Sequence, residues 1–171
     1  MFKINDTIIY GSHGICTIDN ITEQSFGKEI KKYYLLHPHH NPTSTIYVPM
    51  DNEKLISKMR KILSKEEIYE LIKLMPDTDT DTDTDTEWIE NKTERNEYFR
   101  SILSNGNRGE IIKLIKTIYN HGEKLKECGK KLHISDMHFF KEAEKILYDE
   151  FALVLDIEYE QVLPFIINQI K

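Results

Sequence analysis

The first sixty residues alternate between apolar and polar positions in short runs that predict β-strands. Residues 15–21 alternate with period two, as in a strand with one buried face. Residues 44–49 are rich in β-branched and aromatic side chains, which favour strands. Gly11 and Gly14 lie between two of these runs and predict a tight turn. Four or five strands in so short a segment favour a small SH3- or Tudor-like β-barrel, because closure removes exposed strand edges.

The second half of the chain has a helical period to its end. Apolar stripes predict one helix over residues 88–103 and a second from Ile111 toward Cys128. Ser135 is a plausible N-cap for a third helix, and a last short helix holds Val162, Phe165 and Ile166. We expect these helices to form a compact bundle. The predicted fold class is therefore two-domain, β then α.

The segment between the two halves combines a short helix with a low-complexity run. Ser64 and Glu67 match a capping box, in which hydroxyl and carboxylate satisfy the amides at a helix start. After Pro76, the dipeptide Asp-Thr occurs five times over residues 77–86. A run without apolar residues has nothing to bury, so we expect it to be disordered and extended by self-repulsion. We assign a β domain, a linker and a helical domain to residues 1–62, 63–87 and 88–171.

The distribution of charge limits how this chain could contact nucleic acid. The net charge of −6 argues against a protein that coats nucleic acid by bulk electrostatics. Residues 92–131 nevertheless carry 10 basic and 5 acidic side chains, whereas residues 132–171 carry 3 and 8. We see no signal peptide and no membrane span, and Cys16 and Cys128 fit free thiols. We therefore expect a cytoplasmic protein that contacts no membrane.

Several segments, taken in order, resemble the CarD family of bacterial transcription regulators, also called CdnL-like. The first domain of that family is shared with the transcription–repair coupling factor. The resemblance covers nearly the whole chain apart from the Asp-Thr run. The segments that carry it are Phe2–Tyr10 with His13-Gly14, Tyr33–Leu36, Ile46–Asn52, Trp88, Leu103–Gly106, Lys130–Leu132 and Ala143–Leu147.

The resemblance implies a Tudor-like first domain that binds the β subunit of RNA polymerase through an exposed strand. The matching strand here is Thr45, Ile46, Tyr47 and Val48, and a further contact falls near Gln24, a position that is often basic in relatives. An edge strand offers unpaired main-chain groups, so strand addition requires few specific side chains. The alternative is an ordinary barrel strand, whose inward half is core in either case.

The resemblance also implies a helical second domain that reaches promoter DNA at the upstream edge of the transcription bubble. Trp88 matches a tryptophan that acts there as a wedge and slows bubble collapse. Alternatively, Trp88 anchors a helix start, and the two roles are compatible because a wedge must be rigid. Phosphate contacts are expected from the basic residues near Trp88 or near the Ser135 helix start, namely Lys92, Arg95, Lys130 and Lys131.

The chain departs from the family at the expected DNA contact. The residues after the tryptophan are usually rich in arginine, but Ile89-Glu90-Asn91 follow it here. Met137 and His138 stand where relatives usually carry lysine or arginine. We therefore expect weak, largely non-sequence-specific DNA binding, with polymerase supplying the effective concentration.

No residues form a recognisable catalytic constellation. His37, His39 and His40 could suggest a metal site, but no cysteine or carboxylate is spaced with them and an exposed loop explains them better. We expect no enzymatic activity, catalytic residue, metal, cofactor or small-molecule substrate. The main hypothesis is a polymerase-bound regulator, associated with the nucleoid, that stabilises the open promoter complex. The alternative is a Tudor-like adaptor whose helical domain contacts protein rather than DNA.

Overall fold

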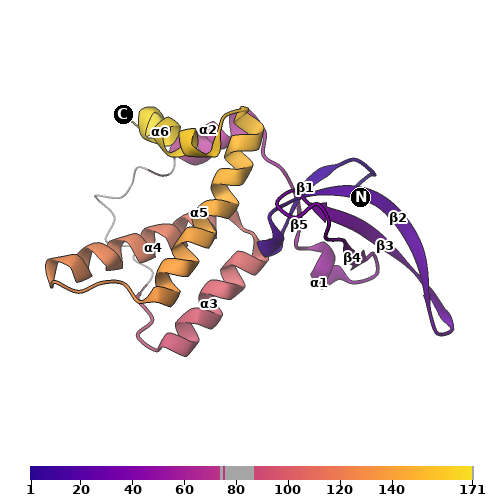
Figure 1. Cartoon of the computed structure of the whole chain (residues 1–171), viewed down its shortest axis with the longest axis horizontal. Coiled ribbons are helices and arrows are strands. Elements are labelled where there is room, and N and C mark those ends of the chain that lie inside the picture. Colours follow the sequence, from indigo (N-terminus) through magenta and orange to yellow (C-terminus); the bar gives the residue numbers. More distant parts are fainter. Residues whose placement is uncertain (74, 76–86, 171) are drawn as a thin grey trace. The chain divides into compact units, whose positions relative to one another are not determined.

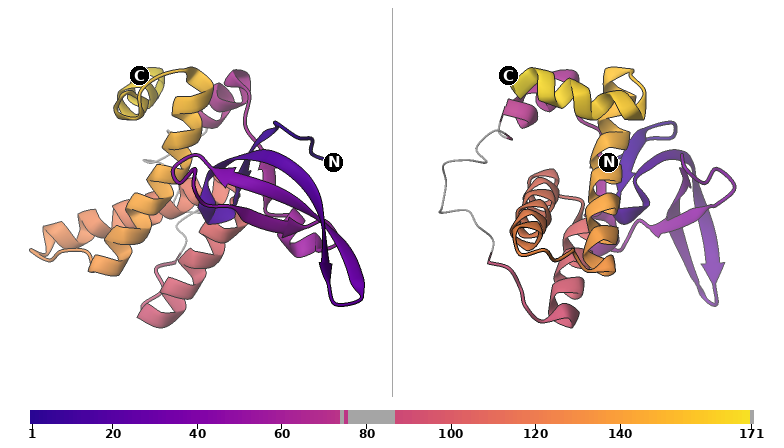
Figure 2. Two further views of the ribbon diagram at one scale, coloured as in Figure 1. Left: turned by 45° about the vertical axis from the view of Figure 1, so that its right-hand side comes forward. Right: turned by 60° about the vertical axis from the view of Figure 1, so that its left-hand side comes forward.

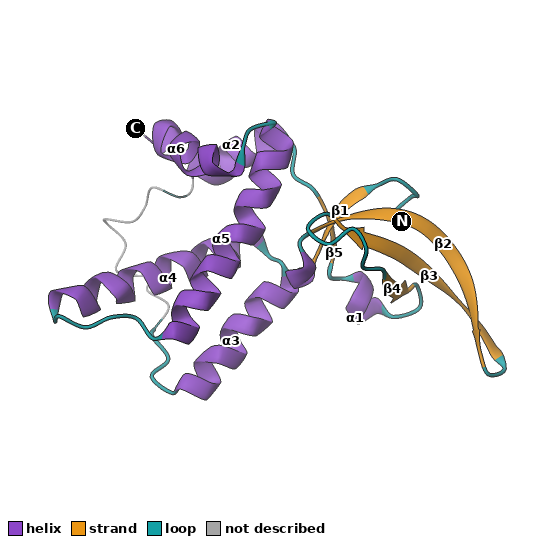
Figure 3. Cartoon of the chain, viewed as in Figure 1, coloured by secondary structure: helices purple, strands orange, loops and turns teal. Residues whose placement is uncertain are grey.

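The computed structural model describes residues 1–73, 75 and 87–170, and it divides the chain into two compact units. Unit 1 is Met1–Ile62 and unit 2 is Leu63–Lys171. Strands occur in unit 1 and long helices in unit 2 (Figure 3). A β unit followed by a helical unit confirms the coarse fold class that the sequence predicts.

Unit 1 is a five-stranded antiparallel sheet with the strand order β4-β3-β2-β1-β5. The two central strands, β2 and β3, are much longer than the others and form a curved hairpin (Figure 1). A barrel would require the edge strands β4 and β5 to meet, and that part of the expectation stays a prediction. The elements are β1 (Thr7–Tyr10), a 3-10 turn (Gly11–His13), β2 (Ile15–Phe26), β3 (Glu29–Pro38), β4 (Ile46–Pro49), α1 (Glu53–Ile56) and β5 (Met59–Lys61).

One face of this sheet forms the core of unit 1. Ile8, Cys16, Ile18, Leu36 and Val48 are fully buried there, and they come from β1, β2, β3 and β4. Burial raises the pKa of the Cys16 thiol to about 11, so this cysteine is an unreactive core side chain. The predicted alternation holds at Cys16 and Ile18, but a register shift between Ile18 and Asn20 then places Ile21 against the same core.

The described residues of unit 2 form five helices. The helices are α2 (Lys65–Lys73), α3 (Lys92–Asn105), α4 (Arg108–Glu127), α5 (Ile134–Leu155) and α6 (Tyr159–Ile170). α3, α4 and the first half of α5 share one core, which includes Phe99, Leu114 and Phe139. The second half of α5 packs with α2 and α6 in another core. Helix α2 also packs against α6, and the right-hand view of Figure 2 shows these two helices next to each other.

Local signals decide where these helices begin. The capping box is confirmed: the Ser64 N–H donates to Glu67 Oε2 at 2.7 Å, and the Glu67 N–H donates to Ser64 Oγ at 3.2 Å. Ser135, however, is not the N-cap of α5. His133 occupies that position, and its Nδ1 accepts from the Ser135 N–H at 3.1 Å. A ring nitrogen replaces the expected hydroxyl as the acceptor.

The first predicted helix also starts later than residue 88. Asn91 caps α3, because its side-chain oxygen accepts from the Thr93 and Glu94 N–H groups at 2.9 and 3.2 Å. Asparagine is a strong N-cap residue, so the helix begins at Lys92. Trp88 consequently lies in the segment that leads into the helix, not within it.

The structure corrects the assignment of residues 63–87 to a linker. Ile68 and Ile72 of α2 are buried with Phe151 of α5 and Val162 of α6, so α2 is part of the unit 2 core. The Asp-Thr run therefore lies between two helices of unit 2 and does not join the two units. The predicted disorder of this run concerns residues outside the described ranges. In the described part of the chain, no helix is both long and apolar enough to cross a membrane.

A buried carboxylate connects the start of unit 2 to two of its helices. Glu150 of α5 is 2% exposed. It accepts from the Leu63 N–H at 2.8 Å and from Arg108 Nε of α4 at 2.8 Å. Because its partners satisfy it, this buried charge stabilises one arrangement of these three segments.

We predict that Glu150→Ala destabilises the protein by about 3 kcal/mol or more. The change leaves the Arg108 guanidinium and the Leu63 N–H without the buried carboxylate that they share. Urea unfolding followed by circular dichroism measures the effect. Glu97→Ala, which removes an exposed carboxylate of α3, is the control and should change the free energy of unfolding by less than about 0.5 kcal/mol. Equal effects of the two variants would contradict the assignment.

Candidate functional site

Strand β4 is an edge of the sheet, with one side paired and the other side open. The Met50 N–H donates to the Lys32 carbonyl at 2.9 Å. Hydrogen-bonded pairs alternate along antiparallel strands, so Ile46 and Val48 direct their main-chain groups toward β3. Tyr47 and Pro49 then direct theirs away from β3, where the Pro49 carbonyl already accepts from the Asn52 N–H at 3.3 Å. Pro49 has no N–H, which fits an outward position on an edge strand.

Apolar and amide side chains share the outer face of the same sheet. Tyr47 is 50% exposed, and its ring contacts that of Tyr33 edge-on, with centroids 6.3 Å apart. Gln24 lies opposite Lys31 in the register of β2 and β3, and Lys31 is on the same face of β3 as Tyr33. Residues directly opposite each other share a face. The structure therefore brings Gln24 and Tyr47 onto one surface, with β3 between them.

Reasoning from the sequence missed two contributors to this surface. Tyr33 lies beside Tyr47, and Lys31 forms an ion pair with Asp51 at 2.9 Å. Their alternation with the buried Tyr34 is the signal that could have identified them. Thr45 is exposed just before β4, whereas Ile46 is half-buried and Val48 is core, so the expected contact strand presents only its alternate side chains.

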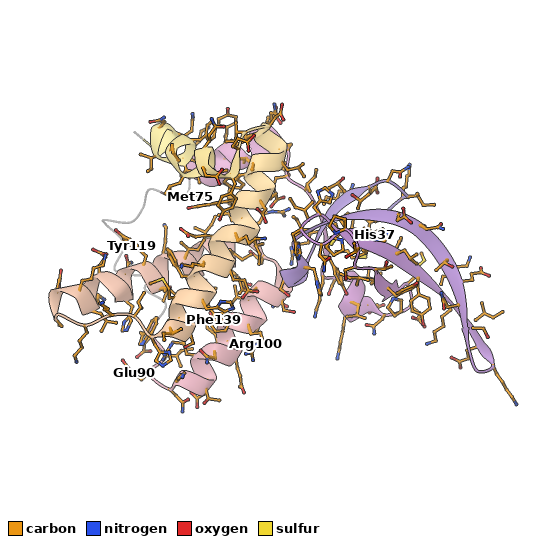
Figure 4. The ribbon with its side chains drawn as sticks, in the orientation of Figure 1. His37, Met75, Glu90, Arg100, Tyr119 and Phe139 are labelled. Carbon is orange, nitrogen blue, oxygen red and sulfur yellow. The ribbon has the colours of Figure 1, made fainter. Side chains whose placement is uncertain are left out.

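Trp88 is half-buried against the α3–α4–α5 core of unit 2 and contacts three other side chains. The imidazole of His121, on α4, stacks on the indole with ring centroids 3.6 Å apart and planes only 7° from parallel. Phe99 of α3 contacts it edge-on at 6.1 Å, and Phe99 in turn packs on Phe139 of α5, which Figure 4 labels. Trp88 is therefore both anchored and partly accessible.

The Arg95 guanidinium holds the segment that carries Trp88. It lies over the indole, with the guanidinium carbon 4.6 Å from the ring centroid. Its Nε and Nη2 donate to the two carboxylate oxygens of Asp136 at 2.9 and 3.0 Å. Its Nη1 donates to the carbonyls of Ile89 and Glu90 at 2.8 and 3.1 Å. One side chain thus connects the Trp88 segment, α3 and α5.

This arrangement corrects the expected role of Arg95. Its side chain is 6% exposed, and its donors are directed at Asp136 and at two main-chain carbonyls. A guanidinium in this position is not free to contact a DNA phosphate. Arg95 is a positioning residue for Trp88, and the signal that the sequence lacked is the tertiary partner Asp136, 41 residues away.

The other expected phosphate contacts are exposed. Lys92 lies in the first turn of α3, and Lys130 and Lys131 lie between α4 and α5. The α4–α5 connection passes close to α4 at Gly122. A Cβ built on this glycine would lie only 3.0 Å from Leu132 Cδ1. Gly122 directly follows His121, so this close approach brings the connection to the turn of α4 that carries the Trp88 stack.

Two of the histidines expected in an exposed loop, His37 and His39, have hydrogen-bond partners within unit 1. His37 Nδ1 lies 3.0 Å from the Ser44 carbonyl, and His39 Nε2 lies 2.9 Å from Thr17 Oγ1. Over residues 1–73, 75 and 87–170, no group of three or more His, Cys, Asp or Glu side chains could hold a metal ion. These contacts fix the loop between β3 and β4.

The comparison with known families covers the first unit. Residues 2–63 match the model of the CarD-like/TRCF RID domain. Unit 1 belongs to this family. The resemblance stated for its strands is confirmed, and the CarD-like/TRCF RID domain is a non-enzymatic interaction domain. Both β4 and the Tyr33–Tyr47 surface lie within this domain, whereas Trp88 and its partners lie beyond the matched residues. No curated protein matches the chain.

We predict that Arg95→Lys loosens the Trp88 segment. A lysine keeps the charge but cannot reproduce the two-pronged carboxylate contact together with both carbonyl contacts. We expect a loss of about 2 kcal/mol in the free energy of unfolding and a red shift in the emission of Trp88, the single tryptophan. Arg100→Lys, at an exposed position of the same helix, is the matched control. Indistinguishable emission spectra and stabilities for the two variants would refute the positioning role.

Proposed function

We propose that this protein binds the RNA polymerase β subunit through the open edge of β4 and stabilises the open promoter complex through Trp88. The observation that carries the proposal is the CarD-like/TRCF RID domain, whose edge strand β4 pairs with β3 on one side and, among the described residues, with no strand on the other. The domain family supports a transcription-related protein that interacts with RNA polymerase. The β subunit, the open complex and the DNA contact are the further steps that we propose.

The polymerase contact is supported by main-chain and side-chain features of unit 1. The outward main-chain groups of Tyr47 suit addition of a strand from the partner. The Tyr33–Tyr47 pair adds exposed aromatic area, and tyrosine combines such area with a polar hydroxyl that suits an interface. Gln24 and Thr45 lie at the margin of this contact. We further propose that unit 1 is curved in the manner of a Tudor-like barrel.

The proposed DNA contact depends on the rigidity of Trp88. Separating stacked bases costs a few kcal/mol, least where the duplex already opens, so a fixed aromatic edge can act at the margin of a bubble. His121, Phe99 and Arg95 supply that rigidity. Lys92, Lys130 and Lys131 are exposed and supply phosphate contacts. We propose that DNA binding is weak and depends on recruitment by polymerase.

A second candidate function is an adaptor whose helical unit contacts protein. It is favoured by the exposed side of α6, where Tyr159, Leu163 and Ile167 are 38%, 47% and 45% exposed at four-residue spacing. The sequence from Ile146 to Ile170 contains five acidic residues and no basic residue. An apolar stripe in acidic surroundings repels DNA and suits a protein partner.

We predict that Tyr47→Pro weakens binding to RNA polymerase more than Tyr47→Ala. Both variants remove the tyrosine ring, but only proline also removes the main-chain N–H at the open edge. Co-purification of the full-length variants with core polymerase measures the difference, which we expect to be roughly tenfold in affinity. Circular dichroism confirms that both variants fold. Equal binding by the two variants would exclude strand addition at β4.

We also predict that Trp88→Ala shortens the lifetime of open promoter complexes while polymerase binding stays intact. The lifetime after a competitor challenge should fall roughly tenfold, which corresponds to about 1.4 kcal/mol. Tyr119→Ala, which removes an exposed aromatic ring from α4, is the matched control and should leave the lifetime unchanged. An unchanged lifetime with Trp88→Ala would favour the adaptor.

A further inference from the structure

The closest ring contact described in the chain joins Trp88 to a titratable side chain. The His121 imidazole lies 3.6 Å from the indole centroid and almost parallel to it. His121 belongs to α4, whereas Trp88 belongs to the segment before α3, so the stack fixes one against the other. Arg95 holds the main chain of that segment through the carbonyls of Ile89 and Glu90 and also lies over the indole at 4.6 Å, whereas the His121 imidazole makes the closer and nearly parallel contact with the ring.

We propose that neutral His121 is the residue that orients the Trp88 ring, and that gaining a proton weakens this hold. The inference rests on the proposed function, because it assigns pH regulation to the contact that Trp88 makes with the bubble edge. The imidazole is a flat ring that covers one face of the indole. Arg95 lies over the same ring and Phe99 contacts it edge-on, so only the exposed part of this half-buried side chain is left for the DNA.

Burial, rather than the charges around His121 taken together, opposes its protonation. Partial burial is the main cause that lowers the pKa of His121 from 6.5, and the cations Arg95 and Lys124 act in the same direction. Glu90 and Asp136 favour the proton, but Arg95 already forms an ion pair with Asp136. A proton on His121 would place a second cation beside a ring that already contacts the Arg95 guanidinium.

The sign of the resulting pH dependence follows from this lowered pKa. The unfolded chain takes up the proton more readily than the folded chain. The contribution of neutral His121 to stability is therefore complete above pH 6.5, and it is lost as the pH falls through the lowered pKa of the folded state. Histidine is the side chain that ordinarily changes its charge between about pH 5 and pH 8. The Trp88 contact should therefore weaken on acidification.

The alternative is that His121 only fills space in the core, and the chain offers variants that separate the two roles. His121→Phe keeps a flat ring and removes the titration, whereas His121→Ala removes both. His138→Phe is the control, because its side chain is 75% exposed and its ring contacts Phe139 rather than Trp88. Since Trp88 is the single tryptophan, its emission reports on this stack in the free, full-length protein.

The first measurement is Trp88 emission between about pH 5 and pH 8. We expect a transition with a midpoint below 6.5 in the unchanged protein and in His138→Phe, and no transition in His121→Phe. The same transition in His121→Phe would overturn the inference, whatever Trp88 does on DNA. Thermal unfolding by circular dichroism establishes that each variant is folded.

The second measurement is the lifetime of the open promoter complex at pH 7.5 and at about pH 6. We expect His121→Ala to shorten it about threefold to tenfold at pH 7.5, the range that aromatic pair energies imply, and by no more than that at about pH 6, because protonation already weakens the hold in the unchanged protein. His121→Phe should keep the lifetime and abolish any extra loss at the lower pH. If Trp88→Ala shortens the lifetime but both His121 variants match the unchanged protein, the inference fails alone. If Trp88→Ala has no effect, the proposed function fails and the emission result stands by itself.

Discussion

The ion pair between Arg95 and Asp136 is the contact on which the rest of the candidate site depends. The segment that carries Trp88 belongs to no helix or strand, so no regular main-chain ladder holds it. Arg95 supplies that hold, because it donates to both oxygens of Asp136 and to two carbonyls of the segment. A buried ion pair stabilises a structure when its remaining polar contacts are satisfied, as they are here. The Arg95 guanidinium, which was expected to contact DNA, instead makes the Trp88 segment rigid.

The two proposed contacts therefore have different physical origins. At β4, the main chain itself is the binding element, and the fold keeps it available by leaving one side of the strand unpaired. At Trp88, a single side chain is the proposed binding element, and its position is fixed by its contacts with α3, α4 and α5. Substitutions within the unit 2 core can thus affect the second contact without touching the first. Substitutions in the unit 1 core affect β4 through Val48.

Features that depend on residues close together in the sequence were predicted correctly more often than features that depend on residues far apart. The capping box of Ser64 and Glu67 spans three residues and was predicted correctly, as was the half-buried strand that buries Cys16 and Ile18. The start of α5 was predicted wrongly, because His133 caps the helix although hydroxyl and carboxamide side chains are the usual caps. Arg95 was expected at a phosphate because it is basic and close to Trp88. Its actual partner, Asp136, could not be foreseen because it lies 41 residues away. The burial of α2 likewise depends on α5 and α6.

A weak DNA contact is a consistent outcome for a chain with a net charge of −6. With Arg95 engaged by Asp136, the exposed lysines expected at phosphates are Lys92, Lys130 and Lys131. Three such contacts release roughly three counterions, far fewer than the 6 to 10 contacts of proteins that bind DNA strongly by themselves. The few phosphate contacts would contribute little binding free energy. In the proposed function, the rest would come from a rigid indole placed where base pairs are already open. In the function proposed above, recruitment through β4 would raise the local concentration, and the Trp88 contact would then have only to slow the closing of DNA that polymerase has opened.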